Sequence, residues 1–311
     1  MTTQRSTLEA RRSVTADGWA WIDGEYLPMS EARISILDTG FVRSDLTYDV
    51  VGVWGGKFFR IDDHLDRFER GCEALRLEMP MRRAEVFEIL HEVVMRSGLR
   101  EAYVEVIVTR GVPERGERDP RRLKPRLYAY AIPYVWIVGP ELQKAGTKVV
   151  VARDTRRTPP GAIDPTVKNF QWGDFVRGLF EAYDRDASLP ILTDGDGNVT
   201  EGPGFNVFAL VEGVLYTPAL GVLEGITRMT VCEIAAAEGI ETRVEQVPVS
   251  ALYRASELFL TSTAGGVMPV SELDGQPVGM NCPGSATTAI RDRYWKWHDD
   301  PRFATEIDYG E

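Results

Sequence analysis

Lys168 is the residue whose type and setting could carry covalent chemistry. The chain has six lysines and thirty arginines, and of these two cations only the lysine amine can lose its proton when desolvated and attack a carbonyl carbon. The other five lysines lie in turns, in loops, beside strands or in the C-terminal tail. Lys168 instead lies between a proline-containing turn and a Phe-Gln-Trp run, within residues 164–174. The alternative is that Lys168 is an ordinary surface lysine. Whether it is reactive therefore has to be judged from the other residues of the chain.

Other positions could complete a site for pyridoxal 5'-phosphate, which needs an amine for its aldehyde, an acid beside its ring nitrogen and anion donors for its phosphate. Glu201 could serve the ring nitrogen, and Arg60 could pair with the phosphate. Residues 225–227 open a helix, where unpaired N–H groups and the helix dipole favour an anion. Thr263 offers a hydroxyl before Ala-Gly-Gly. Singly, each has a plain structural explanation: a strand end, a surface cation, a helix cap or a turn.

Hairpins alternating with helices must position these residues. Alternation and turn residues predict the strands, and apolar spacing with capping residues predicts the helices. One helix is expected to be capped by Asp62 or Asp63, and residues 38–40 are expected to form a turn. The strands are expected at 19–27 (a hairpin), 33–37, 46–54, 57–60, 103–109, 127–135, 148–153, 190–193, 199–201, 205–211, 214–217, 257–262, 267–273 and 276–278. The remaining helices are expected at 83–97, 174–184 and 285–297, with another that residues 225–227 open and that ends near Gly239.

This order predicts the α+β class with mixed or antiparallel sheets. Residues 1–15 are expected to be a polar tail, and residues 138–146, around Gly-Pro, an interdomain linker. The loop 110–126 is long enough to suggest a functional lid. Two arginine-rich runs, residues 118–124 and 153–157, are interpreted as solvated loops, in which one arginine could serve an anionic substrate.

Composition and charge exclude several functions. A net charge of −11 argues against a nucleic-acid partner, and the absence of a long apolar run argues against a membrane span. The N-terminus lacks the apolar core of a signal peptide. Three cysteines without a CxxC pair fit a reducing cytoplasm. The three histidines show no metal-binding spacing, so no catalytic metal is expected.

The order of these motifs resembles one family along nearly the whole chain, the class IV (branched-chain-type, fold type IV) pyridoxal-phosphate aminotransferases. The matching pieces are Lys168, Glu-Gly-x-x-x-Asn at 201–206, Leu-Glu-Gly-Ile-Thr-Arg at 223–228, Thr-Ser-Thr-Ala at 261–264, and Phe-Arg followed by His-Leu-x-Arg at 59–67. The resemblance implies two α/β domains, 16–137 and 147–311, with the cofactor at their interface. It implies the cofactor-binding residues Arg60, Lys168, Glu201, Asn206, Ile226, Thr227, Ser262 and Thr263.

Within the family, the stretches 44–50, 168–174, 201–206 and 263–266 look most like the (R)-selective amine transaminases. One departure is Arg43, which stands where most relatives of this subgroup are expected to have histidine, and which could favour carboxylate-bearing substrates. Another is Glu224, where many have proline. Arg115 or Arg118 in the long loop could meet a carboxylate. The substrate residues implied are Arg43, Tyr48, Val50, Tyr103, Glu105, Arg115, Trp172 and Ala264.

The activity implied is ping-pong transfer of an amino group from an (R)-configured primary amine to a keto acid such as pyruvate. Lys168 would hold the cofactor as a Schiff base and act as the general base. The resemblance also implies a homodimer whose neighbouring subunit helps to close the site. A D-amino-acid or branched-chain amino-acid aminotransferase is the alternative, followed by an aminodeoxychorismate lyase. A non-catalytic binding protein of the same fold would be colourless.

Overall fold

The chain folds into two units, and the boundary between them is not a single point in the sequence. In the computed structural model, which describes residues 18–310, the first unit comprises residues 18–135, 168–170 and 301–310, and the second the rest. Residues around Lys168 and the C-terminal segment thus belong to the first unit, unlike the expected split at 16–137 and 147–311. The expected tail, residues 1–15, lies outside the described residues.

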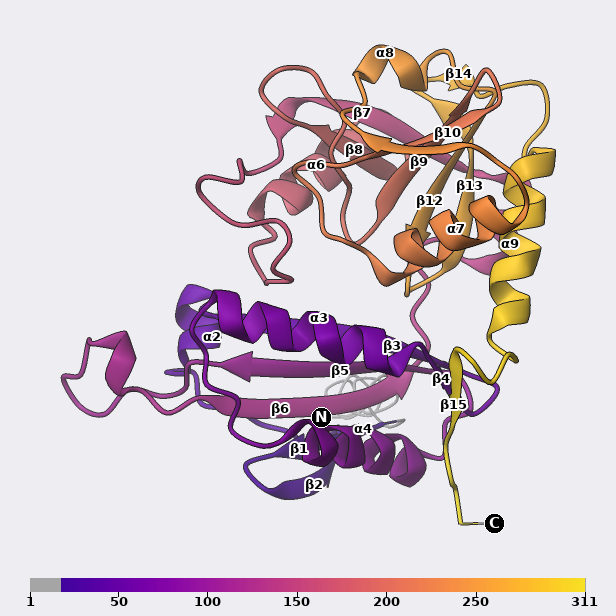
Figure 1. The fold of residues 1–311 in the computed structure, drawn as a ribbon. Helices are drawn as coiled ribbons and strands as arrows, with labels where there is room; N and C mark the ends of the chain where they lie inside the picture. The colour runs from indigo at the N-terminus through magenta and orange to yellow at the C-terminus, as the bar shows by residue number, and fades with distance from the viewer. Residues whose placement is uncertain (1–17, 311) are drawn as a thin grey trace, which may run out of the picture. The chain divides into compact units, whose positions relative to one another are not determined.

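The first unit is built on an antiparallel sheet (Figure 1). In the described part of the chain its strand order is β15-β4-β3-β5-β6-β1-β2. The strands are β1 (Trp19–Ile22), β2 (Glu25–Pro28), β3 (Leu46–Trp54), β4 (Lys57–Phe59), β5 (Ala102–Thr109), β6 (Arg126–Pro133) and β15 (Ala304–Glu306), and the helices are α2 (Thr39–Arg43), α3 (Ile61–Ala74), α4 (Arg83–Ser97) and the short 3-10 helix η1 (Pro120–Arg122).

Alternation along β3, β5 and β6 gives this sheet two faces of different character. Residues such as Val51, Val104 and Ala131 point to one face, where α3 packs over β3 and α4 over β6 and β1. This face holds the main apolar core of the first unit. The opposite face carries Tyr48, Val50 and their cross-strand neighbours, a small separate cluster. The two-residue alternation along these strands thus leaves the Tyr48 and Val50 face outside the main core, where it can contribute to a binding site.

Three expectations for the first unit were wrong. Residues 33–37 form no strand, and Ile36 and Leu37 are 73% and 60% exposed, so the alternation there is a surface pattern. Residues 38–40 are not a simple turn, because Asp38 caps α2 by accepting a hydrogen bond from the Gly40 N–H at 2.8 Å. Helix α3 begins before Asp62, with Arg60 at its N-cap position.

The second unit contains a mixed sheet, with order β11-β10-β9-β12-β13-β7-β8 among the described residues and β14 paired to β13. Pairs β10–β11, β13–β7 and β7–β8 are parallel and the others antiparallel. Its strands are β7 (Thr147–Arg156), β8 (Leu189–Thr193), β9 (Asn206–Val211), β10 (Val214–Pro218), β11 (Thr242–Glu245), β12 (Glu257–Ser262), β13 (Gly266–Leu273) and β14 (Gln276–Pro277), and its helices are α5 (Pro140–Ala145), α6 (Gly173–Tyr183), α7 (Ile226–Ala237), α8 (Val249–Leu252) and α9 (Ser285–Trp297). The α+β prediction with mixed and antiparallel sheets is confirmed.

The expected linker, residues 138–146, contains helix α5. The Gln143 side chain is buried there and donates to the carbonyl oxygens of Val138 and Gly265, at 2.9 and 3.0 Å. Gly-Pro at 139–140 starts the helix, because proline suits its first position. Elsewhere, β11, α8 and β15 were not predicted, since each is only three or four residues long.

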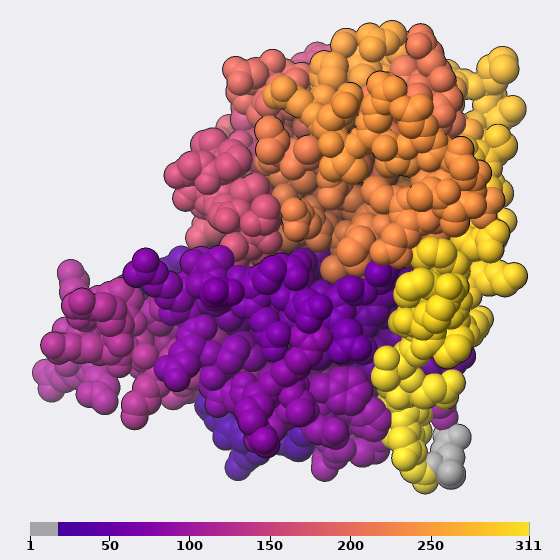
Figure 2. Space-filling view, viewed as in Figure 1, coloured from indigo at the N-terminus to yellow at the C-terminus, as the bar shows by residue number. Residues whose placement is uncertain are grey.

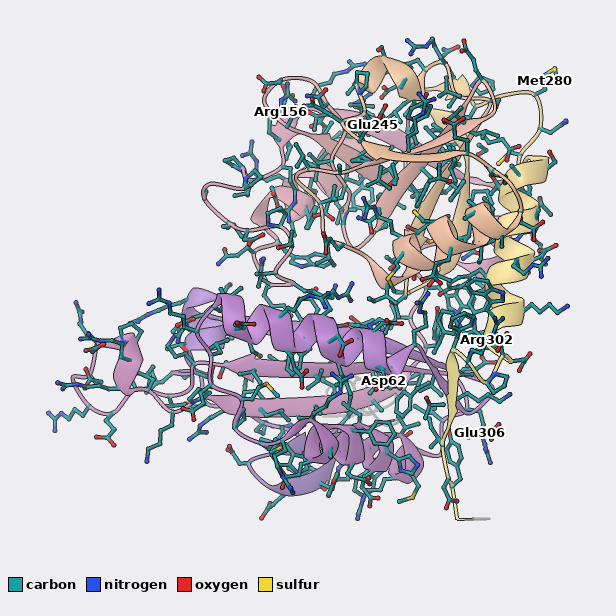
Figure 3. The ribbon with its side chains drawn as sticks, viewed as in Figure 1. Asp62, Arg156, Glu245, Met280, Arg302 and Glu306 are labelled. Carbon is teal, nitrogen blue, oxygen red and sulfur yellow. The ribbon has the colours of Figure 1, made fainter. Side chains whose placement is uncertain are left out.

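The C-terminal segment closes one edge of the first sheet. Strand β15 pairs antiparallel with β4, with Ala304 opposite Phe59 and Glu306 opposite Lys57. In Figure 2 this yellow segment runs over the surface of the first unit, and Figure 3 labels Arg302, shortly before β15, and Glu306, the last residue of β15. None of the helices in residues 18–310 combines the length and apolarity needed to cross a membrane.

Candidate active site

Lys168 lies against the first sheet, along the edge of β3. Its carbonyl oxygen accepts hydrogen bonds from the Thr47 hydroxyl at 2.9 Å and the Tyr48 N–H at 3.2 Å. The half-buried side chain places Nζ 4.5 Å from the centre of the Tyr48 ring. The Phe170 ring lies 4.5 Å from the same ring. Both ends of this short segment are therefore held on β3, and the amine is fixed over an aromatic face.

Four expected substrate residues share the sheet face that bears the Tyr48 ring. Tyr48 and Val50 are two residues apart on β3, and Tyr103 and Glu105 are two apart on β5. Val50 pairs with Glu105 across the two strands, so all four side chains point to the same side. The structure brings these residues together.

Glu105 is a buried carboxylate at the centre of this face. Its Oε2 accepts hydrogen bonds from the hydroxyls of Tyr103 at 3.0 Å and Tyr130 at 2.9 Å. Burial raises the pKa of Glu105, while the two tyrosine hydrogen bonds and the Lys168 charge oppose that shift. Burial and the Glu105 charge raise the pKa of Tyr103 well above its usual value, so its hydroxyl remains protonated.

A buried charge network lies on the other face of β3. Asp49 accepts two hydrogen bonds from Arg67, each 2.8 Å, and one from His64 Nδ1 at 2.8 Å. Burial alone would raise the pKa of Asp49, but the Arg67 charge and the His64 hydrogen bond hold it well below its usual range. Burial lowers the pKa of His64 despite its carboxylate partner, so the ring is neutral near pH 7. The network ties α3 to β3.

Arg60 occupies a strained backbone position at the start of α3. Its φ is 55° and its ψ 42°, the left-handed region that residues other than glycine rarely adopt. The backbone N–H donates to the Phe303 carbonyl oxygen at 2.7 Å, and Nε donates to Asp63 at 2.6 Å. The side chain is buried and lies over the Phe303 ring, 5.1 Å from its centre.

The expected arginines of the substrate site are not among these contacts. Arg43 is exposed in the last turn of α2. Arg115 and Arg118 are exposed in the 110–126 loop, which is organised by Arg121 and Arg122 pairing with Asp119 and Glu117.

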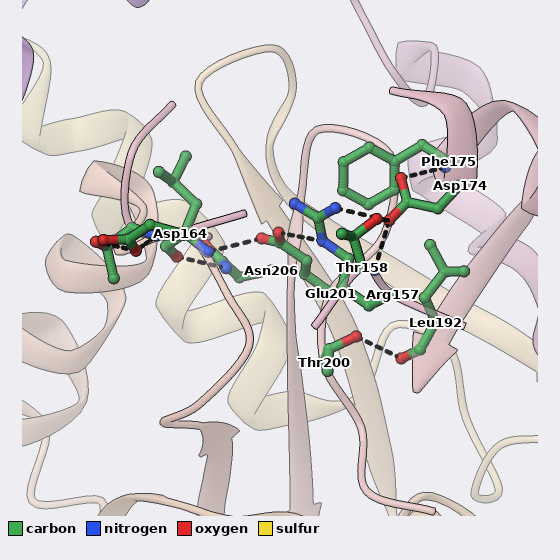
Figure 4. Close-up of polar contacts among 11 residues, drawn as sticks. Arg157, Thr158, Asp164, Asp174, Phe175, Leu192, Thr200, Glu201 and Asn206 are labelled. Carbon is green, nitrogen blue, oxygen red and sulfur yellow. Dashed lines mark hydrogen bonds and ion pairs between the residues drawn. The ribbon is translucent and has the colours of Figure 1, made fainter. Parts of the chain in front are cut away.

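Glu201, in the second unit, is held by a buried arginine (Figure 4). Its Oε1 accepts from Arg157 Nε at 3.1 Å, and its Oε2 from the Leu223 N–H at 2.9 Å. Arg157 also pairs with Asp174 at 2.7 Å and lies 4.2 Å over the Phe175 ring. The interpretation of residues 153–157 as a solvated loop was wrong, because residues 153–156 belong to β7 and Arg157 is only 8% exposed. An ion pair this buried fixes the Glu201 carboxylate in place.

The N-terminus of α7 is shaped by Asn206 and a glycine. Asn206 is buried, and its Nδ2 donates to the Leu223 carbonyl oxygen at 2.9 Å. A Cβ on Gly225, the N-cap residue, would lie 2.2 Å from Asn206 Oδ1, so only glycine fits. Ile226 and Thr227 open the helix, where the first N–H groups have no intrahelical acceptor. The buried Thr227 hydroxyl lies 3.5 Å from the Tyr294 hydroxyl of α9.

The turn from β12 to β13 contains the other expected residues of this unit. The Ser262 hydroxyl accepts from the Ala264 N–H at 3.1 Å, and the Ala264 carbonyl accepts from Ile137 at 2.9 Å. Thr263 is half-buried between them. Trp172 stands at the N-cap position of α6, with its ring 5.4 Å from the Phe175 ring.

Sequence reasoning missed several residues that contact the expected ones, among them Tyr130, Arg157 and Tyr294. Tyr130 reaches Glu105 only because β6 pairs with β5 in register, and Tyr294 reaches Thr227 only through packing of α9 on α7. Arg157 belongs to the arginine-rich run 153–157, but the neighbouring sequence contains no signal that distinguishes a buried arginine from a solvated one.

The residue types in each unit suit pyridoxal phosphate. In the first unit Lys168 supplies an amine held against β3. In the second unit Glu201 supplies a fixed carboxylate, and the N-terminus of α7 offers an anion site that the absence of a side chain at Gly225 leaves accessible. No cluster of three metal-binding side chains occurs in the part of the chain that the structure describes.

Comparison with known proteins identifies the family. Residues 46–273 match the family model "Amino-transferase class IV". The chain is 31% identical over 277 residues to a putative branched-chain-amino-acid aminotransferase of Methanocaldococcus jannaschii, covering 88% of this chain and 94% of the relative. It is 30% identical over 272 residues to a D-alanine aminotransferase of Bacillus licheniformis, covering 86% and 93%.

Solved structures agree. The chain resembles a branched-chain amino acid aminotransferase from T.th. that was solved with pyridoxamine 5'-phosphate, with a TM-score of 0.87 and 27% identity over 94% of this chain and 99% of that one. The protein therefore belongs to the class IV aminotransferases. It is an aminotransferase with the fold type IV architecture, it uses pyridoxal phosphate, and its substrates are amines and keto acids.

Proposed function

We propose that this aminotransferase moves an amino group from an (R)-configured primary amine to a keto acid such as pyruvate, by a ping-pong reaction. The observation that carries the proposal is the buried Glu105 carboxylate on the face shared with Tyr48, Val50 and Tyr103. A fixed negative charge there disfavours a substrate group that carries a carboxylate of its own. An uncharged aromatic or aliphatic group suits the tyrosine walls.

The residues of this chain divide the work. When bound, pyridoxal phosphate supplies an aldehyde that takes up the amine and a ring that delocalises negative charge from the reacting carbon. Lys168 would hold the aldehyde of the cofactor, and its amine would take the proton from the substrate carbon that bears nitrogen. Glu201, held in place by Arg157, would be the acid beside the ring nitrogen. As the family resemblance implies, Ile226 and Thr227 through their N–H groups, and Arg60, Ser262 and Thr263 through their side chains, would hold the phosphate.

The positions of the arginines support the amine reading. Arg43 and Arg115, the cations that could recruit a carboxylate, are both exposed and have no described contact to the Glu105 face. The handedness rests on the resemblance of residues 44–50, 168–174 and 201–206 to the (R)-selective subgroup.

The second candidate is an amino-acid aminotransferase acting on D- or branched-chain amino acids. The relatives named above favour it, because they carry those names. In that case the amino donor, and not only the keto acid, brings a carboxylate that needs a donor, and the exposed arginines of the 110–126 loop could supply it.

We also infer a homodimer. Five large apolar side chains before β3 are exposed, and a second copy of the chain covering them would remove this area from water. They are Ile34, Ile36, Leu37, Phe41 and Val42, between 47% and 73% exposed. Analytical ultracentrifugation of the wild type and of Phe41→Asp tests this: a dimer that Phe41→Asp dissociates is expected, and a wild-type monomer refutes it.

The deciding experiment is a half-reaction on cofactor-loaded protein, followed through the visible absorbance of the bound cofactor. (R)-1-phenylethylamine, its (S) enantiomer, D-alanine and L-leucine are each added alone. Bleaching by the (R)-amine and not by the (S) is expected. Bleaching mainly by D-alanine or L-leucine transfers the assignment to the second candidate, and a wild-type protein that binds no cofactor overturns both.

A further inference from the structure

We propose that Phe303, in the C-terminal strand segment, is a positioning residue for Arg60, and that residues 303–309 thereby set the affinity for the cofactor phosphate. This inference rests on the proposed role of Arg60 as a phosphate ligand. It assigns a function to a segment that lies outside the residues matched by the family model, 46–273.

The segment is anchored to the first unit along its whole length. Strand β15 pairs with β4, and the Ile307 N–H donates to the Gly56 carbonyl oxygen at 3.1 Å. Ile307 itself is 6% exposed and belongs to the main core of this unit. Further on, the Tyr309 hydroxyl donates to the Leu99 carbonyl oxygen at 2.7 Å, and the Arg100 guanidinium stacks 3.8 Å over the Tyr309 ring. The segment is therefore a fixed part of the unit (Figure 2).

The first residue of this anchored segment makes two contacts with Arg60. The Phe303 carbonyl accepts from the Arg60 N–H at 2.7 Å, and the Phe303 ring lies under the Arg60 guanidinium at 5.1 Å. The first contact restrains the backbone of a residue whose φ is 55°, and a non-glycine residue stays in that region only when its surroundings hold it there. The second restrains the guanidinium through a cation–π contact.

Together with Asp63, these contacts hold Arg60 on three sides. Asp63 accepts from Nε at 2.6 Å, which restrains the planar guanidinium from a further direction. A guanidinium whose rotamer is already fixed loses less conformational entropy on binding an anion. Phe303 therefore acts on phosphate affinity without itself touching phosphate.

The test compares binding of pyridoxal phosphate with binding of pyridoxal, which lacks the phosphate, to apo protein by absorbance titration. Phe303→Leu keeps an apolar side chain and removes the ring. It is expected to weaken pyridoxal phosphate binding about tenfold, the equivalent of about 1.4 kcal/mol, and to leave pyridoxal binding unchanged. Phe303→Tyr, which keeps the ring, should restore wild-type affinity. Tyr309→Phe is the matched control, because it removes only the hydroxyl contact with Leu99 and keeps the ring under Arg100 and both Phe303 contacts with Arg60, so it should keep the wild-type affinity for both compounds.

A double-mutant cycle with Arg60→Ala decides whether the effect passes through Arg60. In that background Phe303→Leu should have no further effect on pyridoxal phosphate affinity. Three results overturn the proposal while leaving the proposed function intact. They are losses of pyridoxal phosphate affinity that add in the double variant, a loss of pyridoxal affinity equal to that of pyridoxal phosphate, and an unchanged pyridoxal phosphate affinity in Phe303→Leu. A wild-type protein that binds neither compound rejects both, and an Arg60→Ala variant with wild-type phosphate affinity rejects the inference alone.

Discussion

Glu105 and Tyr130 stand directly opposite each other on β5 and β6, and the Tyr130 hydroxyl donates to the Glu105 carboxylate at 2.9 Å. The pairing places a negative charge and its donor on the sheet face that also carries Tyr48 and Val50. The two tyrosine hydroxyls satisfy this carboxylate, and no arginine or lysine donates a hydrogen bond to it among the described contacts. The charge therefore remains available to act on substrates.

Glu105→Gln should relax discrimination against acceptors with a second carboxylate. Removing the charge is expected to raise the kcat/KM ratio of 2-oxoglutarate to pyruvate about tenfold, since about 1.4 kcal/mol of repulsion is lost at the transition state. Steady-state assays with each keto acid measure the ratio. Glu88→Gln, on the exposed surface of α4, is the control.

The same preference should depend on pH. Burial raises the pKa of Glu105, so the carboxylate takes up a proton as pH falls through that raised value, and the wild-type ratio should then approach that of Glu105→Gln. A ratio that is identical in both proteins at all pH values would show that the charge plays no part.

Gly225→Ala should weaken cofactor binding and destabilise the protein. The added Cβ meets Asn206 Oδ1 at 2.2 Å, and relief requires a shift of the α7 N-terminus at a cost of about 1–3 kcal/mol. Pyridoxal phosphate affinity should fall more than pyridoxal affinity. Gly161→Ala is the matched control, because its Cβ meets nothing within 4 Å, and denaturant unfolding should show a change below about 0.5 kcal/mol.

Lys168→Arg should abolish transamination without unfolding the protein. The guanidinium keeps a cation near the Tyr48 ring but cannot take up the proton from the substrate, so turnover should fall by at least about 10²–10⁴-fold. Lys148→Arg, at a surface pair with Glu272, should retain full activity. Circular dichroism confirms folding of both variants, and appreciable turnover by Lys168→Arg would remove the lysine from its assigned role.

Asp49→Asn should cost about 3–5 kcal/mol of unfolding free energy, because Arg67 is left buried without its counter-charge. The matched control is Asp66→Asn, whose exposed pair with Arg83 should contribute less than about 1 kcal/mol. The Asp49 pKa is lowered in the folded state. The stabilisation is therefore complete above the ordinary carboxyl pKa of about 4 and declines only as pH falls below it. The difference in unfolding free energy between the wild type and Asp49→Asn, measured by urea unfolding, should be smaller at pH 3 than at pH 7.

The regular elements were predictable because their signals are local. The helix at Arg83–Ser97 ends at Gly98 as expected, and Ser285–Trp297 matches its prediction at both ends. The face shared by Tyr48, Val50, Tyr103 and Glu105 follows from period-2 alternation once two strands pair. Such information lies within a few residues of the chain.

What the sequence did not reveal depends on distant partners. Arg60 at an N-cap position is stabilised by Phe303, which lies near the other end of the chain. Arg157 is buried only because Glu201 and Asp174 converge on it. Residues 33–37 alternate like a strand but find no partner. In each case the outcome depends on whether another element supplies a contact, which propensity and periodicity do not encode.

The pairing of β15 with β4 has a consequence for how the protein is made. The first sheet uses residues from both ends of the chain, and its unit also takes in the Lys168 segment from the middle. During synthesis, the edge of β4 that pairs with β15 stays unpaired until almost the whole polypeptide has left the ribosome. A fragment ending near residue 135 would lack both inserted pieces and expose that edge. A C-terminal fusion adds its bulk directly after the segment that contacts Arg60.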